Sequence, residues 1–361
     1  MTSPVEPLGA GGRVVVPLFA EPHAHLDRAF TSAITGVNRS GSLDEGVRLF
    51  KAALSVMTVE ALVPGASRAL GLLEAAGVGH VRTHTAIGGA LGFRAWEAVE
   101  QAASTVPGVE VRQVAMPVDA NLHHPEVGSW LREAAGRGAV AVGGAPWRAE
   151  DPAKATRAAG LLAGELGIGL DLHVDETDDP QVDTLPDLVA VVDEVGLSRQ
   201  AVAVHCCSLA GRPETVARRE AEALARAGVA VVICPVSNLC LQGRQAGGRG
   251  IAPVRLLREA SVTLGIGIDN ICDAVVAVGT ADPLRAAWLL AIGGHLTGED
   301  DLEWLGRTVV AGNRRLCGLP EGLHPGDPAD VLLIDAGSLA EAVTLVPSRK
   351  RLTAEAARRG G

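Results

Sequence analysis

The sequence has few aromatic residues: Phe, Trp and Tyr together make up 2% of its 361 positions, and tyrosine is absent. Leucine, valine and alanine must therefore build the core, and aromatic stacking platforms for a ligand are largely excluded. No apolar run reaches the roughly 18 residues that a membrane helix needs. The N-terminal stretch MTSPVEPLGAGG has neither the basic nor the apolar region of a signal peptide. We therefore expect a cytoplasmic protein.

Basic clusters and paired cysteines are also missing. The net charge is -10 and the pI is near 5.5, with no block of Lys or Arg, which argues against nucleic acid or membrane partners. A small-molecule partner is favoured instead. Six cysteines occur without a CxxC pair, and three of them lie in apolar runs, which is typical of reduced core residues. A hydrophobic content of 47% and a mean hydropathy of +0.23 supply enough material for a large globular core.

Eight short apolar runs rich in β-branched residues recur about every 30 residues. They cover residues 13–25, 77–85, 109–117, 139–146, 168–176, 200–208, 229–237 and 262–270. Segments with helical spacing separate most of them, such as 59–77, 125–138, 154–167 and 214–228. Apolar strands that alternate with helices indicate a parallel sheet, and eight such units indicate a closed (β/α)8 barrel of the TIM type. A doubly wound open sheet is the alternative, but no Gly-rich phosphate turn follows the first strand.

Histidines and acids gather at the predicted C-terminal ends of these strands, where a barrel carries its active site. The first run ends in EPHAH, and side chains at i and i+2 of a strand share a face, so His23 and His25 should converge. With His173 and Asp269 they form a nitrogen and oxygen ligand set for a first-row divalent ion. An open position for water suits hydrolysis, because the ion lowers the pKa of that water. Five other histidines are interpreted as structural: His80, His123, His124, His295 and His324.

The chain carries six motifs in succession: EPHAHLDRAF, GVGHVRTHT, DLHVDETDD, AVHCCS, NLCLQGR and GIDNICDA. Together, in order and spacing, they resemble the cytosine deaminase branch of the amidohydrolase superfamily, from about Val14 to Leu345. The resemblance implies a (β/α)8 barrel that holds zinc or iron through the four ligands named above. Binuclear relatives place a modified Lys at the end of strand 4, and the run 139–146 offers none. One ion per chain is therefore expected.

The resemblance also implies catalytic roles. Glu176, three residues after His173, would take a proton from the attacking water and deliver it to a ring nitrogen. His205 would steady the water, and with Asp269 it would stabilise the tetrahedral species and pass a proton to departing ammonia. The alternative for Glu176 is a helix-capping partner or a solvated acid in a loop.

Three positions depart from the pattern of the cytosine deaminases. Val118 stands where those enzymes present a Gln to the amide edge of the base. Val275 stands at or near a Trp that covers the ring, and Asn270 replaces an Asp. These changes retain the chemistry and alter the recognition of the ring, so a substrate other than cytosine is expected.

Four further residues are candidates for substrate contact. The motif NLCLQGR places Asn238, Gln242 and Arg244 by the pocket mouth, and His84 is interpreted as part of the pocket wall. The Arg244 guanidinium could meet a carboxylate or phosphate of the substrate, or it could lie exposed on a loop.

We therefore expect a metal-dependent hydrolytic deaminase of a small nitrogen heterocycle. Metal-bound hydroxide would attack an amidine-like carbon and release ammonia. The alternative is an amidohydrolase that cleaves a cyclic amide or an N-alkyl C–N bond, since the same residues would serve either reaction. A non-catalytic metal-binding barrel is the third hypothesis. The identity of the released amine separates the first two.

The predicted barrel covers residues 13–320. Residues 1–12 and 321–361 are assigned to tails and to a small, reduced β-sandwich formed mainly by C-terminal strands. Because few residues precede the first strand, an edge of that sheet would be left open, and a second subunit could cover it. This predicts a homo-oligomer.

Overall fold

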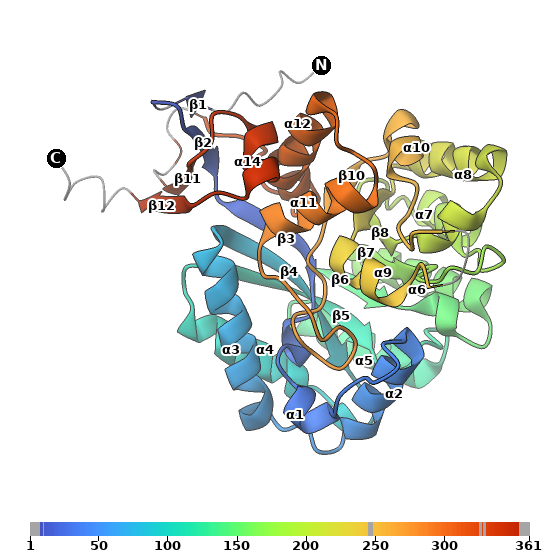
Figure 1. Ribbon diagram of the computed structural model, residues 1–361. Coiled ribbons are helices and arrows are strands. Elements are labelled where there is room, and N and C mark those ends of the chain that lie inside the picture. The colour runs from blue at the N-terminus through green and yellow to red at the C-terminus, as the bar shows by residue number, and fades with distance from the viewer. Residues whose placement is uncertain (1–7, 10, 245–247, 325–326, 328–329, 354–361) are drawn as a thin grey trace.

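The computed structural model describes residues 8–9, 11–244, 248–324, 327 and 330–353, and its centre is a nearly closed barrel of eight parallel strands (Figure 1). The strands follow one another around the barrel in chain order. They are β3 (Phe19–Ala24), β4 (Val78–Ile87), β5 (Glu110–Pro117), β6 (Ala141–Gly144), β7 (Gly169–Val174), β8 (Ala201–His205), β9 (Ala230–Ile233) and β10 (Leu264–Ile266). Each overlaps one of the eight apolar runs, which confirms the predicted (β/α)8 fold.

The barrel closes between its last strand, β10, and its first, β3, just beyond the regular part of β10. The backbone N–H of Asp269 donates to the carbonyl of His23 at 2.8 Å. The N–H of His25 donates back to the carbonyl of Asp269 at 3.2 Å. Two of the predicted metal-binding segments are therefore joined to each other by backbone hydrogen bonds.

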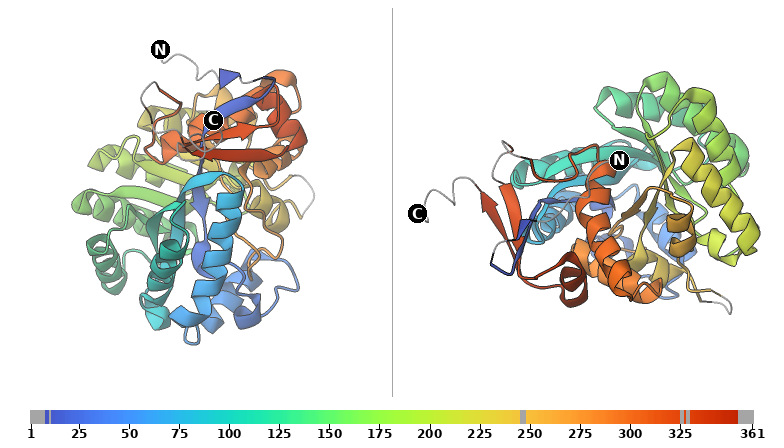
Figure 2. Two further views of the ribbon diagram at one scale, coloured as in Figure 1. Left: turned by 90° about the vertical axis from the view of Figure 1, so that its left-hand side faces the viewer. Right: turned by 90° about the horizontal axis from the view of Figure 1, so that it is seen from above.

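Helices surround the barrel and cover its ends (Figures 1 and 2). They are η1 (Leu26–Arg28), α1 (Ser32–Thr35), α2 (Leu43–Ala53), α3 (Val59–Ala75), η2 (Gly89–Leu91), α4 (Arg94–Thr105), α5 (Pro125–Gly136), η3 (Pro146–Arg148), α6 (Pro152–Leu166), α7 (Leu185–Val195), η4 (Cys207–Gly211), α8 (Glu214–Ala227), α9 (Pro235–Leu241), α10 (Val254–Glu259), α11 (Pro283–Gly293), α12 (Glu299–Arg307), η5 (Thr308–Gly312), α13 (Asn313–Leu316) and α14 (Leu339–Leu345). The four segments with helical spacing became α3, α5, α6 and α8. Gly167 and Gly228 end α6 and α8 with positive φ, as a left-handed C-cap requires.

The alternation of side chains along each strand separates two environments. In β7, Leu170, Leu172 and Val174 pack in the main hydrophobic core. Asp171 and His173 point the other way, into the barrel, where they meet other polar side chains. Because both faces are buried, the strand reads as apolar in sequence except at the residues that build the site.

A small antiparallel sheet lies beside the barrel (Figure 2). Its strands run in the order β1 (Leu8–Gly9), β2 (Val14–Pro17), β11 (Asp330–Ile334) and β12 (Arg349–Thr353). Val14–Pro17 was expected in the barrel but pairs with β11 instead. Pro17 has no N–H for a ladder, so the chain can leave this sheet there and enter the barrel at Phe19.

Two of the four strands thus come from each end of the chain, and the N-terminal segment contributes more than expected. Part of the tail regions assigned to 1–12 and 321–361 lies outside the described residues. All six cysteines are unpaired, and Cys206, Cys207 and Cys234 are buried. In the described part of the chain no helix is long and apolar enough to cross a membrane.

Asn313 provides a test of the barrel closure. Its Oδ1 accepts from the N–H of Ile266 at 2.9 Å, and its Nδ2 donates to the carbonyls of Ile266 and Ala20, so one buried side chain joins β10 to β3. We expect Asn313→Ala to lower the free energy of unfolding by roughly 2–4 kcal/mol, because buried backbone groups lose their partners. Urea unfolding followed by circular dichroism measures this. The exposed Gln101→Ala is the control, and equal midpoints for the two variants would contradict the assignment.

Candidate metal centre and active site

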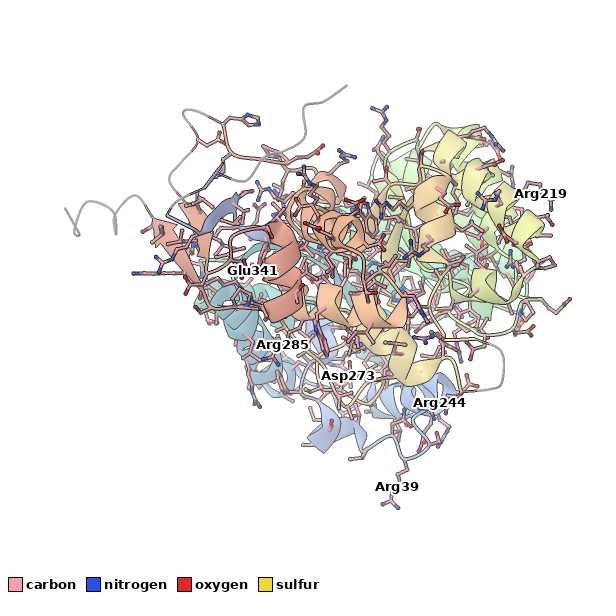
Figure 3. The ribbon with its side chains drawn as sticks, turned by 45° about the horizontal axis from the view of Figure 1, so that its top comes forward. Arg39, Arg219, Arg244, Asp273, Arg285 and Glu341 are labelled. Atoms are coloured by element: carbon pink, nitrogen blue, oxygen red, sulfur yellow. The ribbon has the colours of Figure 1, made fainter. Side chains whose placement is uncertain are left out.

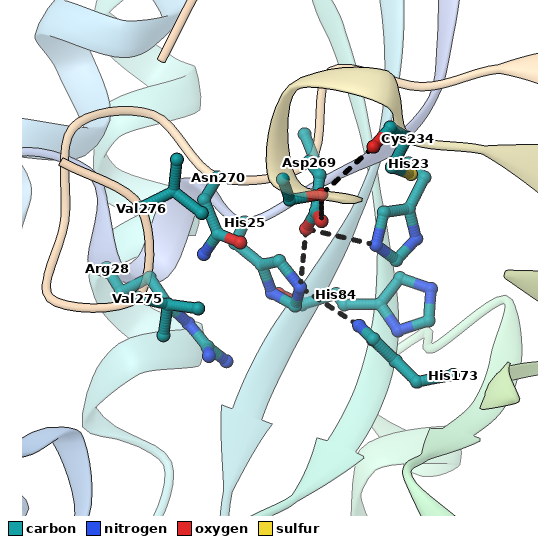
Figure 4. Close-up of polar contacts among 12 residues, drawn as sticks. His23, His25, Arg28, His84, His173, Cys234, Asp269, Asn270, Val275 and Val276 are labelled. Carbon is teal, nitrogen blue, oxygen red and sulfur yellow. Dashed lines mark hydrogen bonds and ion pairs between the residues drawn. The ribbon is translucent and has the colours of Figure 1, made fainter. Parts of the chain in front are cut away.

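Three histidines and one aspartate converge inside the C-terminal end of the barrel (Figure 4). His23 lies near the end of β3, His25 directly follows that strand, His173 lies near the end of β7, and Asp269 follows β10. Their ligand atoms all lie within 4.8 Å of one another, and all four residues are buried. Nε2 of His25 is 3.1 Å from Nε2 of His173, and Oδ1 of Asp269 is 3.4 Å and 3.3 Å from Nε2 of His23 and His25.

The chemistry of this cluster fits a divalent cation. The Nε2 of His23 and the Oδ1 of Asp269 are buried without a hydrogen-bond partner among the described residues. Burial lowers the pKa of His25 and His173 well below the usual value, so both imidazoles are neutral at pH 7 and present lone pairs. Buried polar atoms left in this way are costly unless they bind an ion. These four residues could therefore hold a metal.

Asp269 is held in position by a neighbour on α9. The Ser237 hydroxyl donates to its Oδ2, which leaves Oδ1 turned toward the imidazoles. Burial would raise the pKa of Asp269, but the imidazoles beside it, with His23 first, outweigh burial and lower the pKa below its usual range. Asp269 has a φ of 65° and His205 one of 75°, left-handed conformations that are uncommon outside glycine. The backbone is thus strained at two of the predicted functional positions.

His205 and Glu176 face the same space beside the cluster. Nε2 of His205 lies 3.8 Å from Oε2 of Glu176 and 4.0 Å from Oδ2 of Asp269. The amide nitrogen of Asn238 is 2.9 Å from Nδ1 of His205, and since an amide nitrogen can only donate, the imidazole proton belongs on Nε2. Burial, followed by the charge of Asp269, raises the pKa of Glu176 well above its usual value.

Glu21 lies under the candidate metal-binding segments, and the sequence analysis did not predict a role for it. Its Oε1 accepts from the N–H of His23 at 2.9 Å and from the N–H of Ile268 at 3.0 Å. The side chain is completely buried, and burial raises its pKa to about 8. Glu21 therefore ties β3 to the segment that carries Asp269. An acid two residues before His23 inside an apolar run was the available signal.

His84 lies deeper in the barrel, next to Arg82 and Asp171. Its Nε2 is 3.2 Å from Oδ1 of Asp171, whose Oδ2 is 2.9 Å from Nε of Arg82. The ring of His84 is 4.4 Å from the ring of His23. Burial lowers the pKa of His84 to about 4, so this imidazole is neutral as well. The structure thus places His84 against His23, a candidate metal ligand, inside the barrel.

A cavity of about 600 Å³ opens beside Glu176. Gln242 lines it and donates from Nε2 to the carbonyl of Glu176 at 2.9 Å, which holds the loop that carries the acid. Trp147, on η3, forms part of the wall, an aromatic surface that the composition had made unexpected. Arg244, labelled in Figure 3, also lines the cavity. Its guanidinium donates to the carbonyls of Ser40 and Gly41 and so joins the segment after α9 to the loop before α2.

The remaining predicted contact residues lie around the cluster. Nδ2 of Asn270 donates to Oδ2 of Asp273 at 2.6 Å, so the Asn270 side chain stabilises its own loop. Val275, on that loop, is buried against Leu241. Val118 lines a second, smaller cavity of about 180 Å³.

The fold and the cluster are compatible with a metal-dependent hydrolase, and comparison with known proteins specifies the family. A family model described as "Amidohydrolase family" matches residues 48–357, and the chain belongs to this family. A pterin deaminase from Rhizobium rhizogenes is 34% identical over 185 residues, which cover 50% of this chain and 42% of that protein. An N-isopropylammelide isopropyl amidohydrolase from a Pseudomonas species is 24% identical over 367 residues, covering 96% and 85%.

The solved structures show the same relationship. The 5-methylcytosine deaminase from Klebsiella pneumoniae, liganded with 5-fluorocytosine, superimposes with a TM-score of 0.88 at 28% identity, over 98% of this chain and 89% of that chain. These findings confirm the predicted amidohydrolase superfamily and its cytosine deaminase-like branch. The predicted class, a hydrolase acting on C–N bonds other than peptide bonds, is the class of all three relatives.

Loss of one ligand tests the cluster. We expect His173→Ala to lower bound zinc or iron about tenfold or more, because a four-residue site cannot keep its affinity with three. Metal content per chain, measured by inductively coupled plasma mass spectrometry after dialysis, reports this. The exposed His324→Ala is the control. If His173→Ala kept its metal while His84→Ala lost it, the metal would have to be assigned instead to the neighbouring set of His23, His84 and Asp171.

Proposed function

We propose that this protein removes an exocyclic amino group from a small nitrogen heterocycle by hydrolysis and releases ammonia. The observation that carries the proposal is the position of Glu176, a buried carboxyl group 3.8 Å from His205 and next to an imidazole and carboxylate cluster. The deaminases among the relatives support the same reaction type.

We propose one zinc or iron ion per chain, held by His23, His25, His173 and Asp269. When bound, such an ion lowers the pKa of water toward neutrality and so makes a nucleophile available at pH 7. The ordinary nitrogen and oxygen donors do not decide between the two metals, because cellular supply and geometry select the occupant.

Glu176 is the proposed proton carrier. Its raised pKa, caused first by burial, lets it take a proton from the attacking water and hold it near neutral pH. A ring nitrogen that gains this proton makes the neighbouring carbon more electrophilic. The hydrogen bond from Gln242 to the carbonyl of Glu176 keeps the carboxyl group in place during the transfer.

His205 is the proposed donor to developing negative charge. Asn238 occupies its Nδ1, so its Nε2–H points to the space between Glu176 and Asp269. A preformed donor at this point stabilises the oxygen that gains charge as the C–O bond forms. Asp269 can then assist proton transfer to the departing ammonia.

Two features support a ring larger than or different from cytosine. The cavity of about 600 Å³ beside Glu176 lies in the range that accommodates drug-sized ligands, and Trp147 offers one aromatic wall for stacking. Val118 provides no amide to grip the edge of the base. Pterin and 5-methylcytosine, the rings named for two relatives, are the first substrates to test.

The second candidate is hydrolysis of a C–N bond to an alkylamine. The N-isopropylammelide isopropyl amidohydrolase aligns with 96% of this chain, more than the deaminase from Rhizobium does. Release of isopropylamine rather than ammonia would favour this reaction, and the roles of Glu176 and His205 would be unchanged.

Replacement of the proton carrier tests the proposal. Glu176→Gln preserves the shape of the side chain and removes its titration, so we expect bound metal near the wild-type amount and a kcat lower by about 10²–10⁴-fold. An enzyme-coupled ammonia assay with metal-loaded protein measures this. Glu150→Gln, a change at an exposed residue, is the control. A variant with normal turnover would exclude Glu176 as the carrier.

A further inference from the structure

A small basic recess lies next to the candidate active site. We use this name for the cavity of about 180 Å³ that Arg28, Lys51 and Arg148 line together with the apolar Phe50, Met116 and Val118. No acidic residue lines it. The net charge of the chain is -10, and acids do lie behind this lining: Asp27 pairs with Arg28, and Asp44 pairs with Arg148. The surface that faces the cavity nevertheless presents three cations and no acid.

Arg28 is buried but poorly paired. Its side chain is 9% exposed, and the one ion pair that the described residues offer it is Asp27, whose Oδ1 is 3.4 Å from Nε. The other carboxylate oxygen of Asp27 accepts from the N–H of Ala86 at 2.9 Å, so this acid is also used to hold the backbone. The guanidinium stacks on Phe50 at 4.4 Å. A buried guanidinium carries five donors and normally finds a planar bidentate partner.

Arg148 and Lys51 complete the basic recess from the solvent side. Arg148 donates to Oδ1 of Asp44 at 2.7 Å, but the Asp44 side chain is 83% exposed, and such surface pairs contribute little. Lys51, on α2, is exposed and has no ion pair among the described residues. Both cations can therefore bind a ligand with little loss of existing interaction free energy.

The basic recess and the cavity beside Glu176 share one lining residue. Arg148 lines both the recess and the larger cavity that Glu176 and Trp147 line. The charges of Arg28 and Arg148 also act on Glu176, where they oppose the burial and the Asp269 charge that raise its pKa. Figure 4 draws the Arg28 side chain apart from the imidazole cluster. A ring placed against Trp147 can thus reach the recess with one substituent while another faces Glu176.

We propose that the substrate carries a carboxylate on its ring, and that the basic recess binds this group through Arg28, Arg148 and Lys51. A planar carboxylate matches the fork of a guanidinium, and the apolar walls exclude water from the pair. This anchor takes over the orienting function that an amide at the position of Val118 would have. The inference rests on the proposed function for its reaction, but the binding that it describes can be measured separately.

Matched rings test the inference through turnover. Metal-loaded protein is supplied with 5-methylcytosine and 5-carboxycytosine, and with pterins that lack or carry a ring carboxylate. We expect kcat/KM to be at least tenfold higher for the carboxylated member of a pair. Arg148→Gln and Lys51→Gln should each reduce this preference about tenfold, mainly through KM, and Arg148→Lys should restore part of it. Arg219→Gln, on the outer face of α8 (Figure 3), is the control and should preserve the preference.

Binding of product analogues tests it without turnover. Isothermal titration calorimetry compares uracil-5-carboxylate with uracil on the metal-loaded wild type and on Arg148→Gln. Tighter binding of the carboxylated ring that Arg148→Gln abolishes supports the basic recess, even if no ring in the panel releases ammonia and the deaminase proposal fails. Ammonia release with no preference for the carboxylated rings in either assay would contradict the proposal that the basic recess binds a carboxylate. The proposed deaminase activity would still stand. A stronger preference for a phosphorylated ring would overturn the choice of carboxylate.

Discussion

The closure of the barrel and the assembly of the candidate metal centre depend on the same contacts. Backbone hydrogen bonds between His23, His25 and Asp269 join the first and last strands, and the side chains of these residues are three of the four candidate ligands. Glu21 adds a second connection across the same junction by accepting from the N–H groups of His23 and Ile268. Ligand geometry is therefore fixed by folding, as a preorganised site requires.

Burial gives this site its electrostatics. Imidazoles that are removed from water remain neutral and present lone pairs, whereas the buried Glu176 becomes a weaker acid. Asp269 keeps its charge because its neighbours stabilise the ionised form. One environment thus supplies the candidate metal ligands, a fixed anion and the proposed proton carrier from ordinary side chains. The basic recess adds the opposite charge a short distance away, where a substrate could be oriented.

Much of the fold was predictable because strands that are buried on both faces leave a simple apolar pattern. The His23 and His25 pair was predictable for a related reason, since the strand period places both on one face. The separation of β2 (Val14–Pro17) from the barrel was not, because strands of either sheet read as the same apolar run. Glu21 was overlooked because burial of an acid in a strand is normally unfavourable, and only tertiary structure reveals its two backbone donors.

The sequence does not reveal the directions in which the side chains around the site point. Trp147 and Arg148 lie on the short η3. Packing, rather than a helical repeat in the sequence, sets the directions of its side chains. Arg244 was a candidate anion binder, and the structure turns its guanidinium to backbone carbonyls while Arg28 and Arg148 line the basic recess. The choice between zinc and iron, the homo-oligomer and the cytoplasmic location stay predictions.

The central claim is that water replaces an amino group on a ring carbon at this site. The most direct measurement is mass spectrometry of the product formed in H₂¹⁸O by metal-loaded protein from a ring that releases ammonia. The account predicts one ¹⁸O atom per turnover, bonded to the carbon that lost nitrogen, and ammonia in equal amount. Product that carries ¹⁸O at another carbon, or none, would contradict hydrolytic deamination by this centre.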